Sequence, residues 1–183
     1  MISGLITPQG TDSFKADTWV KVYENTLTSA QTSVTISGLD GDTDVMYRLS
    51  CRFINGYSGA STYQLQPNND TGTNYGHQRL SGDNTAVSAY RITTDTKLNL
   101  GYVAVQNNIC QSEMILYAKS GYVRLALGTE AEGITGTTVA GIYLRGLSWN
   151  NTADNITSLV ISSNQTNGLG IGSYIYLEKL VLS

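Results

Sequence analysis

Three aspartates at alternate positions, Asp40, Asp42 and Asp44, form the densest group of metal-binding side chains in the sequence. Alternating carboxylates of this kind open calcium loops, where their oxygens converge on a hard cation. An EF-hand would continue with a glycine and a distant glutamate, but this chain has Val45 and Cys51 at those places. Two interpretations follow: a calcium site on the three aspartates or, as the sequence favours, a hairpin turn with solvated carboxylates.

Catalytic motifs are scarcer. The single histidine, His77, has no nucleophile motif beside it, so we expect a surface or strand-end residue rather than a member of a triad. Two carboxylates could support glycoside hydrolysis, and the candidates are Glu113, Glu130, Glu132 and Glu178. Nothing in the sequence around these glutamates marks them as a catalytic pair. We therefore expect no enzymatic activity and no cofactor.

Aromatic side chains offer a binding chemistry instead, because an aromatic ring can pack on the apolar side of a pyranose. Trp149 is followed by two asparagines and is the first candidate for a carbohydrate platform. Tyr75 and Trp19 come next. The alternative, which we favour for Trp149, is a tryptophan that closes the end of the core or lies in a subunit interface.

The composition limits the partners that the chain can have. Its 183 residues are the size of one domain. Only 14% of the residues are charged, against roughly 25% in typical soluble domains, and the net charge is -3. Nothing here neutralises a run of phosphates, so we expect no nucleic-acid binding. The sequence also lacks a recognisable signal peptide and any run of membrane-helix length, which predicts synthesis in the cytoplasm without membrane insertion.

Period-two alternation predicts the elements that must position these side chains. Val45–Phe53 is the clearest strand, with alternate residues on one apolar face. In Tyr122–Leu127 the alternation predicts that Leu125 and Leu127 are buried and Arg124 is exposed. In Tyr174–Leu182 the phase is ambiguous near Glu178, which predicts a bulge. The other predicted strands are 19–24, 33–37, 61–66, 98–106, 110–116, 139–149 and 156–162.

Turn signals separate these strands and set the fold class. Glycine, asparagine and aspartate cluster at 39–42, 54–57, 66–70, 81–84 and 167–168. Many short strands with regular turns predict an all-β protein, an antiparallel, jelly-roll-like β-sandwich. We place this single domain at residues 16–183 and interpret residues 1–15 as an arm that reaches a neighbouring subunit. Cys51 and Cys110 fit no metal or redox spacing and are predicted to be buried thiols. A disulfide between them is the less favoured alternative, because a cytosolic origin disfavours it.

Two stretches resemble small virion structural proteins of tailed bacteriophages. The first runs from Leu39-Asp40-Gly41-Asp42 through Tyr47 to the turn 66–75. The second pairs 156–161 with a closing strand after Gly168-Leu169-Gly170-Ile171-Gly172-Ser173. The resemblance implies a lectin-like or jelly-roll sandwich that serves as a capsid decoration, head-fibre or tail-appendage subunit, with no catalytic residues to carry over.

The same resemblance implies the partners and the location. Such a subunit would pack against other virion proteins and identical copies of itself, with a trimer as the expected oligomer, and would be assembled in the host cytoplasm. A receptor-binding or carbohydrate-binding module on the particle surface, directed at a host-surface glycan, is the alternative function.

Overall fold

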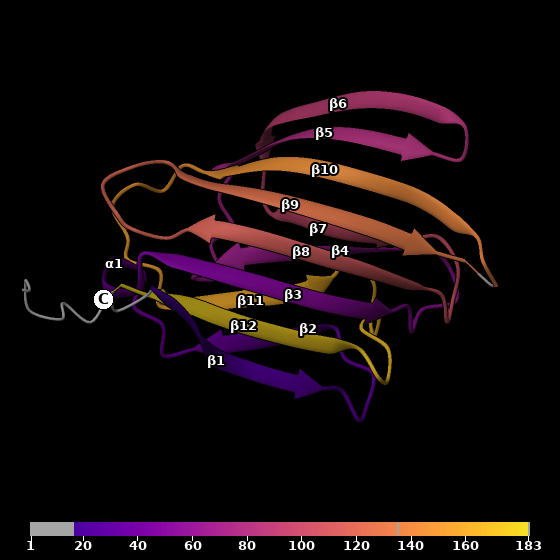
Figure 1. Cartoon of the computed structure of the whole chain (residues 1–183), viewed down its shortest axis with the longest axis horizontal. Coiled ribbons are helices and arrows are strands. Elements are labelled where there is room, and N and C mark those ends of the chain that lie inside the picture. Colours follow the sequence, from indigo (N-terminus) through magenta and orange to yellow (C-terminus); the bar gives the residue numbers. More distant parts are fainter. Residues whose placement is uncertain (1–16, 135, 183) are drawn as a thin grey trace, which may run out of the picture.

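Two antiparallel sheets face each other in the computed structural model, which describes residues 17–134 and 136–182. The eight-stranded sheet contains, in spatial order, β1 (Thr18–Thr26), β12 (Tyr174–Val181), β3 (Met46–Ile54), β8 (Ile109–Tyr117), β9 (Arg124–Gly133), β10 (Val139–Trp149), β5 (Tyr75–Asp83) and β6 (Ala86–Asp95). The four-stranded sheet contains β2 (Ser33–Ser37), β11 (Ser158–Ser163), β4 (Ser61–Pro67) and β7 (Leu98–Val103), and lies behind the larger sheet in Figure 1. One short helix, α1 (Gly41–Asp44), precedes β3. The predicted antiparallel β-sandwich is therefore confirmed.

The core lies between the two sheets and follows the predicted alternation. Tyr47, Leu49 and Phe53 point inward from β3. Phe53 stacks on Tyr63 of β4, with ring centroids 4.2 Å apart. Cys51 and Cys110 are free, buried thiols, as predicted, and burial raises the pKa of both.

The predicted phase of the β9 segment is wrong. Arg124 is 0% exposed, whereas Leu125 and Leu127 are each 61% exposed. The arginine is held in the core because its guanidinium stacks on the ring of Trp149, 5.0 Å from the centroid. It also donates hydrogen bonds to the carbonyls of Ala118 and Asp154. Period-two alternation predicts that two faces exist, but not which face is buried, and here the aromatic ring and the two carbonyls decide it.

Two neighbouring strands at one end of the large sheet, β5 and β6, were not predicted. β5 includes Gly76 and Gly82, which interrupt the apolar pattern. β6 extends past the small sheet and is exposed on both faces over most of its length, so its sequence has no reason to alternate. The turn signal between them is confirmed, since Asn84 adopts a left-handed φ of 50°.

The predicted bulge lies one strand away from its expected position. Leu177 and Glu178 of β12 are both buried, which explains the ambiguous phase. The register shift itself is in β1, where Lys21 pairs with Glu178 and Tyr23 pairs with Leu177. Val22 is therefore the extra residue.

Buried polar side chains join the free edge of the small sheet to the large sheet. β7 is the last strand of its sheet, so its outer backbone groups have no partner strand. Glu130 and Glu132 of β9 accept hydrogen bonds from the backbone amides of Tyr102 and Ala104, at 2.6 and 2.7 Å. Ser112 of β8 donates to the carbonyl of Leu100 at 2.8 Å. These contacts satisfy backbone groups that would otherwise be buried without partners.

The carboxylate of Glu130 is also paired with a buried cation. Arg145 of β10 donates to it, and both side chains are almost completely buried. Burial raises the pKa of Glu130 against the opposing effect of Arg145. A pair of this kind is costly to break, because removal of one partner leaves an uncompensated charge in the core.

We expect Arg145→Met to lower the free energy of unfolding by about 3–5 kcal/mol, because Glu130 would lose its buried partner. The matched control is Arg48→Met, which breaks the more exposed pair between Arg48 and Glu178 and should cost about 1 kcal/mol or less. Urea denaturation followed by tryptophan fluorescence measures both. Equal costs for the two variants would show that Glu130 does not depend on Arg145.

Candidate functional site

The outer face of the large sheet, the one directed away from the small sheet, carries the most exposed apolar surface of the described residues. Residues opposite each other in an antiparallel pair share a face. One such row runs from Leu80 through Leu144 and Thr129 to Glu113 and Ser50, across β5, β10, β9, β8 and β3. The outer face is therefore aliphatic at the β5 end and polar at the β3 end.

We call the aliphatic part of this face the aliphatic patch. It is made of seven side chains from five strands: Leu80, Val87, Ile115, Leu125, Leu127, Ile142 and Leu144. Val87 is the most exposed, at 78%. Two of its members, Leu125 and Leu127, face outward because Arg124 of the same strand is buried.

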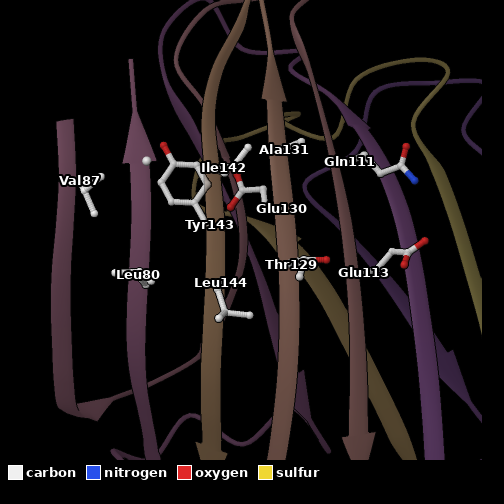
Figure 2. A pocket seen from close by; sticks show the side chains of 11 residues that line it. Leu80, Val87, Gln111, Glu113, Thr129, Glu130, Ala131, Ile142, Tyr143 and Leu144 are labelled. Carbon is white, nitrogen blue, oxygen red and sulfur yellow. The ribbon is translucent and has the colours of Figure 1, made fainter. Parts of the chain in front are cut away.

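Two open hollows share this patch. The first has a volume of about 710 Å³ and is bordered by Leu80, Ile142 and Leu144. Figure 2 shows these side chains with Thr129, Ala131 and Gln111 of the neighbouring strands. The second has a volume of about 760 Å³ and lies beside Leu125, Leu127 and Ile115. Small residues such as Gly82 and Gly146 at the hollows leave the apolar side chains around them accessible.

The opposite end of the outer face carries three half-buried aromatic side chains, Trp19, Tyr174 and Tyr176, which we call the aromatic patch. The two tyrosine rings are nearly parallel, with centroids 6.2 Å apart. The guanidinium of Arg48 lies 4.8 Å from the centre of the Trp19 ring.

Hydrogen bonds hold these aromatic groups in place. The hydroxyl of Tyr174 donates to Glu24 at 3.1 Å, and that of Tyr176 donates to Glu178 at 3.2 Å. Hydrogen bonds from Lys21 and Tyr174 lower the pKa of Glu24. Planar polar groups are thus presented beside aromatic rings in a defined arrangement.

Two of the three predicted carbohydrate residues are buried, and for them the prediction is wrong. Trp149 is 0% exposed, and Tyr75 is also buried and packs beside it. Asp70 explains their position, because its carboxylate accepts from Trp149 Nε1 and its carbonyl accepts from the Tyr75 hydroxyl, both at 2.8 Å. Trp149 closes the end of the core, the alternative favoured from the sequence. Trp19 alone remains accessible.

The three aspartates at 40, 42 and 44 are not brought together as a cation site. Asp40 caps α1 by accepting from Thr43, and Asp42 accepts from the backbone amide of Ser120 at 2.6 Å. Asp44 pairs with Lys179 and accepts from the Tyr47 hydroxyl, each at 2.7 Å. The segment is a one-turn helix rather than the expected hairpin turn. Across 17–134 and 136–182, no group of three or more histidine, cysteine or acidic side chains is placed to hold a metal.

The titratable residues considered for catalysis lie apart from any common site. His77 is the third residue of β5 and is buried, 3.8 Å from Asp95, so of the two expected positions, at the surface or at a strand end, the surface one is wrong. Burial lowers its pKa. Glu130 and Glu132 bind the edge of β7, and Glu178 pairs with Arg48. Only Glu113 of the four glutamates is exposed on the outer face.

The aliphatic patch was missed from the sequence. The alternation that predicts the strands was used to place Leu125 and Leu127 in the core, and β5 and β6 were not predicted. A signal was nevertheless present: β8 and β10 carry isoleucine and leucine on both alternating faces, which indicates strands that are apolar on both sides.

Comparisons with known proteins show similarity to solved structures alone. No family model and no curated protein matches the chain. The galectin LEC-6 of Caenorhabditis elegans is 10% identical, with a TM-score of 0.36 over 87% of this chain and 96% of that one. A bifunctional GH43-CE protein of Bacteroides eggerthii is 9% identical, with a TM-score of 0.29 over 76% of this chain and 18% of that one. Similarity this low assigns no function.

No helix among the described residues is long and apolar enough to cross a membrane.

The carboxylate of Asp70 makes the end of the core sensitive to acid. Burial raises its pKa, but hydrogen bonds from Asn74, Trp149 and Gly72 outweigh this effect, and the pKa lies below the ordinary value of 3.8. A lowered pKa means that this carboxylate stabilises the fold above pH 3.8 and loses that contribution as the pH falls through its folded value.

We therefore expect Asp70→Asn to unfold more easily at pH 7 by about 1–2 kcal/mol, and to lose less stability than the wild type between pH 5 and pH 2 (about the range over which such carboxylates titrate). Urea unfolding curves at several pH values measure both effects. Parallel pH profiles for the two proteins would contradict the assignment.

Proposed function

We propose that this chain is a non-enzymatic assembly subunit that packs against a second copy of itself through the outer face of its large sheet. The observation that carries the proposal is the aliphatic patch, a contiguous set of aliphatic side chains exposed on a regular sheet. Scattered apolar residues are normal on protein surfaces, but a contiguous patch is typical of an interaction site.

The dimensions of the patch suit a protein partner. It covers β8, β9, β10, β5 and β6, which at a spacing of about 4.8 Å span roughly 20 Å. Along the strands the members of the patch span six residue steps of about 3.4 Å, from the level of Ile142 to that of Leu125, or roughly 20 Å. The resulting area, on the order of 400 Å², is about half of the roughly 800 Å² that each partner buries in a standard interface.

The charges on the face favour an identical partner. The seven side chains of the aliphatic patch are neutral, so two copies bring no like charges together at its centre. Arg48, Arg52 and Glu113 lie toward the β3 and β8 side of the face, where an interface has its polar rim. Two-fold self-association is the commonest route by which one patch meets its own copy.

In this proposal the chain belongs to the surface of a tailed-phage particle and is made in the host cytoplasm. It acts by packing alone, with no cofactor. The sequence resemblance to virion proteins supports the proposed location on a phage particle. The low charge content and the neutral patch support packing against neighbouring subunits.

We expect the purified protein to associate as its concentration rises, and Leu127→Arg to weaken this association at least tenfold, because an unpaired charge would be buried in the interface. Light scattering after size-exclusion chromatography measures the mass at each concentration. The matched control is Ile171→Arg, because Ile171 is 64% exposed, as Leu127 is 61% exposed, but lies outside the patch.

Association of the wild type and of Ile171→Arg, with loss in Leu127→Arg, would support the proposal. A monomer at every concentration would contradict it. A monomer that floats with neutral lipid vesicles would instead identify a lipid as the occupant of the patch.

The aromatic patch supports a second function, binding of a glycan. Trp19, Tyr174 and Tyr176 offer accessible aromatic rings, and Glu24, Glu178 and Arg48 offer hydrogen-bonding groups at their edges. A pyranose presents the complementary surface, with C–H groups on one side and hydroxyls around the rim. The groups are already held by hydrogen bonds, which reduces the ordering cost of binding.

For this second function we expect Trp19→Ala to lower glycan binding at least tenfold, because stacking on the ring is lost. The measurement is a glycan array followed by titration of any bound sugar, with and without calcium. Tyr122→Ala is the control, because Tyr122 is an exposed aromatic residue that lies outside the aromatic patch. Equal losses in both variants, or no binding by the wild type, would exclude the aromatic patch as a sugar site.

A further inference from the structure

The two sheets have four outer edges, and three of them are protected against pairing with another strand. β1 carries a bulge at Val22 and the charged residues Lys21 and Glu24. β7 is covered by Glu130, Glu132 and Ser112 of the large sheet. β2 is only five residues long. Bulges, charges, covering groups and short length are the usual means by which native proteins prevent edge pairing.

The fourth edge, β6, has one charged residue, Arg91, and no bulge or covering group from Ala86 to Ile92. It is ten residues long, contains no proline or lysine, and is exposed at every position from Ala86 to Arg91. Its partner β5 pairs with it in continuous register from Asp83–Ala86 to His77–Ile92, and the register shifts only beyond Ile92. β7 of the small sheet packs against β8, β9, β10 and β5, so β6 extends past the small sheet (Figure 1). The backbone groups on its outer side are therefore available to another strand.

We propose that β6 pairs with β6 of a second copy of this chain, antiparallel and about a two-fold axis, so that the two large sheets become one. An axis normal to the sheet keeps the outer faces of both copies on the same side. The inference extends the proposed assembly function by naming a second contact, and it rests on the strand edge rather than on the aliphatic patch.

The part of β6 that pairs regularly with β5, Ala86–Ile92, determines the register of the proposed contact between the two copies. Full overlap of Ala86–Ile92 places Ala89 opposite Ala89 of the second copy, at the two-fold axis. Val87 then lies opposite Arg91 of the second copy, and Ser88 lies opposite Tyr90. Moving the two-fold axis by two residues, from residue 89 to residue 91, would place Arg91 opposite its own copy, and like charges directly opposite each other are destabilising.

Backbone hydrogen bonds would stabilise the proposed contact between the two β6 strands. Seven paired residues form about seven inter-strand hydrogen bonds, within the roughly 5–15 direct hydrogen bonds of a typical interface. Val87 and Ala89 are on the outer face, in line with Gly82 and Leu80 of β5. Pairing therefore joins the aliphatic patches of two copies into one wider surface.

Cysteine cross-linking tests the pairing on the intact chain. In the proposed register two Ala89 Cα atoms lie about 4.5–5.5 Å apart, which suits a disulfide. We expect Ala89→Cys to form a covalent dimer under mild oxidation, seen on a non-reducing gel and by mass. The native thiols, Cys51 and Cys110, are buried and do not interfere.

Val87→Cys is the matched control, because Val87 is on the same face of the same strand and is more than three-quarters exposed. In the proposed register its two copies are about 13 Å apart, four residues along the strand. We expect at least a tenfold slower cross-link. Absence of the dimer in Ala89→Cys, or equal rates in both variants, would overturn the proposal.

The same cross-link, measured in a Leu127→Arg background, separates the two assembly proposals. A cross-link that survives this substitution supports β6 pairing independently of the aliphatic patch. A cross-link that disappears while the variant remains folded by circular dichroism would show that β6 does not pair by itself, and would overturn the inference.

Discussion

The buried contact between Glu130 and the edge of β7 is the interaction on which the arrangement of the two sheets depends. The four-stranded sheet packs on the inner face of the eight-stranded sheet, and its β7 edge faces protein rather than water. Unpaired backbone amides at such an edge would be costly. The large sheet supplies carboxylates from β9 to accept from them, and Arg145 compensates the charge that this brings into the core.

The unequal size of the two sheets then determines the exposed surface. Because the small sheet ends at β7, it covers the inner face of the large sheet only as far as β5, and β6 is left exposed on both faces. The outer face of the large sheet has no second layer at all among the described residues. It nevertheless carries the side chains expected of a core, including Leu127, Ile142 and Leu144. A surface of this composition is the physical basis on which we propose an assembly function rather than a catalytic one.

The two ends of the outer face differ because their neighbours differ. At the β12 and β3 end, Glu178, Arg48 and Trp19 satisfy one another through an ion pair and ring contacts. At the β10 and β5 end the outward side chains include the aliphatic Leu80, Ile142 and Leu144, which no second layer covers among the described residues. A single sheet thus presents one region suited to polar, aromatic recognition and another suited to apolar packing, a few strands apart.

The sequence by itself determined the fold class, most of the strands and their turns, and the buried thiols. Each of these follows from local alternation or from the backbone preferences of glycine and asparagine, as at Asn84. In β9, only the tertiary structure decided which alternating face is buried. The burial of Arg124 depends on Trp149 and on two carbonyls from distant segments, and Trp149 itself is held by Asp70. The proposed arm at 1–15 lies outside the described residues. The edge strand β6 escaped prediction for the same reason, since its exposure reflects the limited reach of another sheet and leaves no local pattern.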